Sequence, residues 1–135
     1  MIFVDTNILI DVASGNPEWA NWSSQALAAA RKRGLLLFNA AVHAEFAIGF
    51  SVALECEAEI GRFDLTFVEI TKAAAFCAAQ AFRQYKRAGG SRTNVLPDFL
   101  IGARADAVNI PLLTRDARRY RTYFPDLELI TPETK

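Results

Sequence analysis

The chain begins with a three-residue apolar run, Ile2–Val4, that ends abruptly at Asp5. A run of β-forming residues that is apolar throughout predicts a strand buried on both faces, as in a parallel sheet. A carboxylate directly after such a strand is costly unless it is paired or bound to a metal. In open α/β sheets, ligands bind at the carboxyl ends of the strands. Asp5 is therefore either the N-cap of the next helix or part of a functional site.

Apolar runs of strand length alternate with segments of helix length along the rest of the chain. We expect strands at 2–4, 35–38, 65–68, 110–113 and 127–130, and helices at 8–12, 17–33, 40–50, 52–61, 72–87, 96–108 and 118–121. This alternation predicts an α/β fold with a parallel sheet covered by helices on both faces. We interpret Phe76, Phe82 and Tyr85, which follow a helical spacing, as core residues.

Length and composition indicate a single domain over residues 1–135. Apolar residues make up 52% of the chain, which excludes disorder. No apolar run approaches the roughly 20 residues of a membrane span, and we recognise no signal peptide, so we expect no membrane association. Cys56 and Cys77 lack metal-ligand spacing and are expected to be buried free thiols, which is typical of a cytoplasmic protein.

Charge is balanced overall but unevenly distributed. The net charge is zero, so the composition does not indicate overall attraction to nucleic acid. Residues 45–69 contain six acids and one base, whereas residues 83–121 contain nine bases and three acids. The basic segment predicts either ordinary solvated helix faces or a local basic rim for a polyanion.

Four acids share one kind of location. Asp5 and Asp116 follow the first and fourth expected strands, Glu45 lies on the helix after the second, and Asp98 lies at a helix start. These positions can converge at one edge of a parallel sheet, where the carboxylates would repel one another unless a divalent cation relieved the conflict. Mg²⁺ and Mn²⁺ prefer such oxygen ligands. The sequence therefore favours metal-assisted phosphodiester hydrolysis.

Other catalytic arrangements have weaker support. The chain contains one histidine, His43, which we interpret as a packed or surface residue because it points to a different helix face from Glu45. This leaves little basis for a Ser–His–Asp or zinc site. A phosphoryl-transfer domain usually has a lysine after a late strand, and no lysine lies between Arg87 and Lys135.

The four acids and their settings resemble the PIN-domain nucleases, and within them the VapC-type toxins of toxin–antitoxin pairs. The matching motifs are Asp5-Thr6-Asn7 after an apolar strand, Ala-Glu45-Phe, Leu-Pro-Asp98-Phe-Leu-Ile-Gly-Ala and Leu-Leu-Thr114-Arg-Asp116. The resemblance implies a three-layer α/β/α sandwich and a Mg²⁺- or Mn²⁺-dependent endoribonuclease acting on RNA, often tRNA or ribosomal RNA. It also implies a homodimer and a cognate antitoxin, which could insert a side chain near the metals or lay an apolar helix in a groove.

The resemblance also assigns roles to individual residues. Its acidic quartet corresponds to Asp5, Glu45, Asp98 and Asp116, of which Asp116 is the least certain metal ligand. Thr6, Asn7 and Thr114 match the polar positions that orient the acids, and we interpret Asp11 as structural. The expected RNA-binding rim consists of Arg115, Arg118, Arg119 and Arg92, followed by Arg87. The alternative is a non-catalytic PIN-like module that binds RNA or protein, although such a module would be expected to have lost one of the acids.

Overall fold

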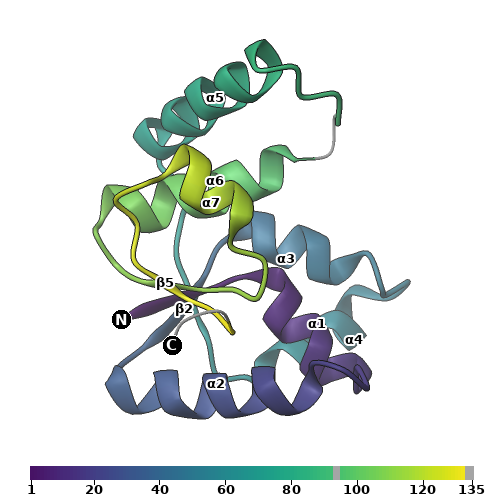
Figure 1. The fold of residues 1–135 in the computed structure, drawn as a ribbon. Coiled ribbons are helices and arrows are strands. Elements are labelled where there is room, and N and C mark those ends of the chain that lie inside the picture. The colour runs from purple at the N-terminus through teal and green to yellow at the C-terminus, as the bar shows by residue number, and fades with distance from the viewer. Residues whose placement is uncertain (93–94, 133–135) are drawn as a thin grey trace.

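The computed structural model describes residues 1–92 and 95–132 (Figure 1). Its strands are β1 (Ile2–Val4), β2 (Leu36–Phe38), β3 (Thr66–Phe67), β4 (Leu112–Leu113) and β5 (Leu129–Ile130). Its helices are α1 (Thr6–Ser14), α2 (Ala20–Arg33), α3 (Ala40–Ala47), α4 (Ala53–Gly61), α5 (Lys72–Arg87), α6 (Leu96–Ala107) and α7 (Arg118–Tyr123). None of the helices in these two ranges is both long and apolar enough to cross a membrane.

The five strands form one sheet in the order β3-β2-β1-β4-β5, and all neighbours pair in parallel. Successive strands move outward from β1 to β2 and β3, and the chain then crosses back to β4 on the other side of β1. Because parallel crossovers are right-handed, this reversal places helices on both faces of the sheet. Figure 1 shows α2 on one face, and α6 and α7 on the other with α5 packed outside α6. The predicted three-layer α/β/α sandwich is therefore confirmed.

Short polar side chains begin several of the helices. Asp5 accepts a hydrogen bond from the Thr6 backbone N–H, and Asn39 accepts two, from Ala41 and Val42, at the start of α3. Thr71 caps α5 by accepting from the backbone N–H of Ala74. Side-chain caps of this kind satisfy the otherwise unpaired N–H groups of a first helical turn. The caps at Asp5 and Asn39 also fix where β1 ends and α1 begins, and where β2 ends and α3, which carries Glu45, begins.

The inner strands and the helix faces against them form one core. Phe3, Val4, Leu112 and Leu113 are fully buried, as expected for strands covered on both faces. The elements are shorter than predicted at several ends. In particular, α2 begins at Ala20 instead of residue 17, because Asn16 accepts from the backbone N–H groups of Glu18 and Trp19 and so holds a separate turn.

Two expectations about α5 were wrong. Phe76 is 65% exposed, because the inward side of this helix is formed by Ala74, Ala78 and Ala81, and Phe76 lies outside that stripe. Cys77 is also exposed, whereas Cys56 is buried, and both thiols are free. Phe82 and Tyr85, at the end of the helix, do pack against the core as predicted.

Candidate active site

Asp5 lies at the point where the strand order reverses. It follows β1 directly, and its backbone N–H donates to the carbonyl of Leu113 in β4 at 2.9 Å. The crevice beyond the carboxyl ends of two such neighbouring strands is where open α/β sheets bind ligands. Thr114 follows β4 at the same level, and its hydroxyl donates to Asp5 Oδ2 at 2.8 Å. Asp5 therefore serves as a helix cap and also occupies the centre of the candidate site.

Neutral donors surround the buried carboxylate of Asp5. Besides Thr114, the Thr6 backbone N–H donates to Oδ1 at 2.7 Å, and the Tyr120 hydroxyl donates to Oδ2 at 2.9 Å. Burial and, to a smaller extent, the charge of Asp98 raise the pKa of Asp5 to about 7, although these hydrogen bonds act to lower it. Burial and the nearby carboxylates raise the pKa of Tyr120, which keeps its hydroxyl protonated as a donor. Tyr120 was not among the residues predicted for the site, although it lies on α7 only four positions after Asp116.

Glu45 and Asp98 approach Asp5 from different helices. Glu45, in the second turn of α3, accepts from the Thr6 hydroxyl at 2.7 Å. Asp98, in the first turn of α6, forms an ion pair with Arg119 of α7. Burial raises the pKa of both acids, and the charge of Asp98 adds to the increase at Glu45. Asp98 therefore lies within electrostatic reach of both Glu45 and Asp5.

Asp116 lies on the loop between β4 and α7. Its backbone N–H donates to the Thr114 hydroxyl at 3.1 Å, and its charge raises the pKa of Asp98. Asn7 connects this loop to α1, because its amide donates to Thr114 at 3.2 Å and its carbonyl accepts from the Arg115 N–H at 3.3 Å. The three polar residues predicted to orient the acids therefore all lie in hydrogen-bond contact with the acids or their loop.

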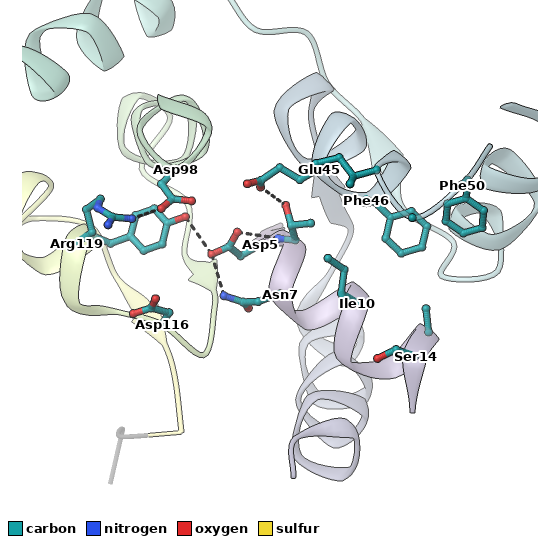
Figure 2. A pocket seen from close by; sticks show the side chains of 15 residues that line it. Asp5, Asn7, Ile10, Ser14, Glu45, Phe46, Phe50, Asp98, Asp116 and Arg119 are labelled. Atoms are coloured by element: carbon teal, nitrogen blue, oxygen red, sulfur yellow. Dashed lines mark hydrogen bonds and ion pairs between the residues drawn. The ribbon is translucent and has the colours of Figure 1, made fainter. Parts of the chain in front are cut away.

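The four acids line one cleft of about 580 Å³ (Figure 2). Figure 2 shows Asp98, Asp116 and Arg119 on one side of Asp5, and Glu45 on the other. Beyond Glu45 the wall becomes apolar and is formed by residues of α1 and α3 and the segment after α3, namely Ile10, Phe46, Ile48 and Phe50. The cleft thus combines a carboxylate end with an apolar end. The predicted site contained the acids but none of these four apolar residues.

The donor set of the acidic end fits a hard divalent cation. Its donors are carboxylate and hydroxyl oxygens, and several of the acids have raised pKa values, which is the charge conflict that a cation relieves. Within residues 1–92 and 95–132, no three carboxyl, imidazole or thiol groups are gathered closely enough to hold an ion directly. Mg²⁺ commonly keeps several waters and takes one or two carboxylates, so the arrangement suits a partly hydrated ion.

Arg115 has a different place from the one that we expected. Its Nε donates to Asp11 Oδ2 at 2.7 Å, its guanidinium lies over the Trp19 ring, and its side chain is 29% exposed. Asp11 is fully buried and also accepts from the Ser23 hydroxyl at 2.8 Å. The charge of Arg115 is therefore balanced by a buried carboxylate, and its contact with RNA stays a prediction. Asp11 has the structural surroundings that we expected.

The remaining predicted residues fall into two groups. Arg92, Arg118 and Arg119 line a second recess beside the cleft. Arg87, at the end of α5, lines neither hollow and is exposed. His43 is half-buried, packs against the Phe38 ring and lies 3.5 Å from a carboxylate oxygen of Glu57. It lines neither hollow, in agreement with its interpretation as a packed or surface residue.

Together, the sheet and the cleft define an α/β domain that gathers acidic side chains at the switch point of a parallel sheet. The PIN domain family model matches residues 2–125, and the chain therefore belongs to the PIN domain family. No curated protein matches the chain in a sequence comparison.

Solved structures share the fold at low sequence identity. A chain of VapBC2 from Rickettsia felis, bound to a DNA fragment from their promoter, is 20% identical with a TM-score of 0.73, and the match covers 97% of this chain and 98% of that one. A toxin–antitoxin complex from Klebsiella pneumoniae contains a chain that is 22% identical with a TM-score of 0.69, and the match covers 100% of both chains. DNA-bound VapBC from Salmonella typhimurium is 16% identical with a TM-score of 0.67, and 96% of each chain is covered.

Proposed function

We propose that this PIN domain is a Mg²⁺- or Mn²⁺-dependent endoribonuclease and the toxin of a toxin–antitoxin pair. The observation that carries the proposal is the convergence of Asp5, Glu45, Asp98 and Asp116 on one cleft, with no cation beside Asp5 among the described residues. The solved structures with the same fold come from VapBC and other toxin–antitoxin complexes, which supports the biological setting.

Asp5 and Asp98 would hold the partly hydrated metal, Glu45 would act on it through a bound water, and Asp116 would act from the edge of the cleft. When bound, the metal supplies a water of lowered pKa as nucleophile and stabilises the charge on the leaving oxygen. Thr114 and Tyr120 hold one oxygen of Asp5, which leaves the orientation of its carboxylate fixed. Thr6 holds one oxygen of Glu45 in the same way. Arg119 pairs with Asp98 through Oδ2, and Oδ1 is the oxygen that Asp98 would offer to a metal.

The substrate that we propose is RNA, with tRNA and ribosomal RNA as the first targets to test. The competing proposal is a non-catalytic RNA- or protein-binding module, which requires no intact acid cluster. All four acids are present and line one cleft, and this favours catalysis. Identifying the cut ends by sequencing RNA from cells that express the protein would define the target.

The decisive experiment measures cleavage of end-labelled RNA in Mg²⁺, in Mn²⁺ and in EDTA. We expect Asp5→Asn and Asp98→Asn to abolish metal-dependent cleavage, because each removes a charged ligand with almost no change in volume. Glu55→Gln, an exposed acid in the first turn of α4, is the matched control and should retain full activity. Full activity of Asp5→Asn in the presence of metal would refute the proposal.

The apolar end of the cleft, together with the exposed apolar residues that follow Ile48 along the chain, is the surface that we propose for the antitoxin. Ile48 is 83% exposed, Val52 is 50% exposed and Leu54 is 79% exposed, and they lie after α3 and at the start of α4. An amphipathic partner helix could cover such a strip. Copurification of the protein with the product of the adjacent gene tests this, and Ile48→Asp with Leu54→Asp should weaken the complex.

We also propose a homodimer, which light scattering of the purified protein would test.

A further inference from the structure

A second recess, of about 380 Å³, adjoins the acid cleft. Asp116 and Arg119 line both hollows, so the two lie side by side. The other residues that line the recess are Tyr85, Arg92, Arg118, Thr122 and Tyr123. We propose that this recess binds one nucleotide of a single-stranded RNA, next to the phosphodiester bond that is cut. The inference rests on the proposed ribonuclease function and adds to it a site for the substrate strand.

Three arginines supply positive charge to the recess. Arg118 is exposed, and it makes no salt bridge with any residue that the structure describes. Arg92 lines the same recess, together with Arg118 and Arg119. Arginine contacts to phosphate oxygens position a nucleic-acid strand without reading its sequence. The recess therefore has the charge needed to hold the backbone of the strand that enters the cleft.

Two tyrosines give the recess an aromatic wall. The rings of Tyr85 and Tyr123 meet edge to face with their centroids 6.2 Å apart. Both rings also pack against the buried ring of Phe99, at 6.0 Å and 5.3 Å. The core thus holds both half-buried rings in place before any ligand arrives, which lowers the entropic cost of binding. Aromatic rings beside arginines are the usual surfaces for unstacked bases of single-stranded RNA.

Arg119 connects the two hollows. Its guanidinium pairs with Asp98 in the acid cleft and lies 5.8 Å from the centroid of the Tyr85 ring. The Tyr85 hydroxyl in turn accepts from the backbone N–H of Arg92 at 3.2 Å, which holds the chain of Arg92 at the rim. A nucleotide held in the recess would consequently be the neighbour of the one in the acid cleft. A base-paired duplex cannot present an unstacked base to the tyrosines, so we assign the recess to single strands.

The test separates binding from cleavage by measuring fluorescence anisotropy of a labelled single-stranded RNA in EDTA. We expect Tyr123→Leu to weaken binding at least about fivefold through lost base stacking, with an unchanged salt dependence. Tyr123→Phe keeps the ring and should bind as the wild type does. Arg118→Ala should weaken binding and reduce the slope of log affinity against log salt by about one.

Arg62→Ala is the matched control, since Arg62 is an exposed arginine just after α4 that lines neither hollow. It should change neither the affinity nor the salt slope. Thermal melting of each variant checks folding. If Tyr123→Leu does not fold, Arg118→Glu, a change of an exposed side chain, tests the same recess and should weaken binding more than Arg118→Ala.

Two results would overturn the assignment. One is that the Arg118→Ala and Tyr123→Leu variants fold and bind the single-stranded RNA as tightly as the wild type does. The other is a duplex RNA that binds as tightly as the single strand. Failure of the recess assignment can be distinguished from failure of the proposed nuclease function. If no metal supports cleavage but binding still depends on Tyr123 and Arg118, the recess stands and the nuclease proposal fails. If the wild type cleaves RNA but binding is insensitive to both residues, only the recess is lost.

Discussion

Asp5 and Asp11 are two buried aspartates, one capping α1 and the other in its second turn, and their surroundings differ in one respect. Asp11 faces a cation, because the guanidinium of Arg115 donates to its two oxygens at 2.7 Å and 3.0 Å. Asp5 faces only neutral donors, from Thr6, Asn7, Thr114 and Tyr120. Both side chains are almost completely buried, at 4% and 0% exposure. The two aspartates differ in how their charge is compensated, and not in how deeply their side chains are buried.

This difference separates a structural carboxylate from a functional one. The Asp11–Arg115 pair fastens the loop after β4 onto α1, and thereby places Thr114 and Asp116 at the site. Asp5 is left without a cation in the described part of the chain, and burial raises its pKa to about 7. A buried carboxylate that lacks a protein cation is suited to receive an external one. The two aspartates should therefore respond in opposite directions when their charge is removed.

The largest effect that we expect on stability is from Asp5→Asn in metal-free protein. The pKa of Asp5 rises from an ordinary value of 3.8 to about 7, so the folded state binds this proton more tightly than the unfolded state does. The contribution of Asp5 to stability is thus most favourable below about pH 4 and is lost as the pH rises toward 7. Asn carries no charge, so at pH 8 the variant should be more stable than wild type by up to about 4 kcal/mol.

Urea unfolding in EDTA at several pH values would measure this effect. The stability difference between the variant and wild type should grow between pH 4 and pH 7 and then level off. Addition of Mn²⁺ should reverse the order, because a ligand that binds only the folded state stabilises it. An Asp5→Asn variant that is less stable than wild type at pH 8 in EDTA would contradict this account of the site.

Asp11→Asn should change the stability in the opposite direction and destabilise the protein. It leaves the guanidinium of Arg115 partly buried without its carboxylate, and breaking such a pair typically costs about 3 kcal/mol or more. Because the Arg115 side chain is 29% exposed, water recovers part of that loss, and we expect a destabilisation of about 2 kcal/mol. The double variant Asp11→Leu with Arg115→Met should recover much of it. A double variant as unstable as Asp11→Asn alone would show that the pair does not act as a unit.

Much of the sheet and of the acid cluster could be predicted from the sequence. The strand ends were visible because apolar runs stop at Asp5, Asn39 and Thr114, and strand ends of a parallel sheet share one edge. Helix caps were visible because Asn39 and Thr71 are short polar side chains before apolar helices. Both signals come from a few consecutive residues, and together they are sufficient to predict the fold.

Contacts between residues far apart in the sequence could not be predicted in this way. Asp11 and Arg115 are separated by 104 positions, and nothing near either residue indicates its partner. The pairing of Arg119 with Asp98 depends on the angle at which α7 crosses α6, which no local pattern sets. Arg115 was therefore assigned to the RNA-binding rim because of its charge, although its partner lies in the interior.

Tyr120→Phe tests the neutral donors of Asp5, with a smaller effect. Loss of one hydrogen bond to the charged form should raise the pKa of Asp5 above its present value of about 7. A hydrogen bond of this kind contributes about 1 kcal/mol, which corresponds to less than one pKa unit. Carbon NMR titration of the Asp5 carboxyl group in EDTA would measure the change. A lowered pKa would mean that the Tyr120 hydroxyl does not donate to Asp5.

The smallest effect on stability that we expect is from Thr6→Val, which acts on Glu45 alone of the acids. The Thr6 hydroxyl donates to Glu45 Oε1 at 2.7 Å, whereas its backbone N–H, which serves Asp5, is retained in the variant. Stability should change by less than about 1 kcal/mol, because Glu45 is half-buried and water can replace the lost donor. Mn²⁺ affinity, measured by calorimetry, should fall roughly tenfold, as is typical when a residue that orients a ligand is lost. Thr6→Ser keeps the hydroxyl and should preserve the affinity. Equal losses in both variants would point to the threonine methyl group, and the case for Glu45 as a ligand held by Thr6 would fail.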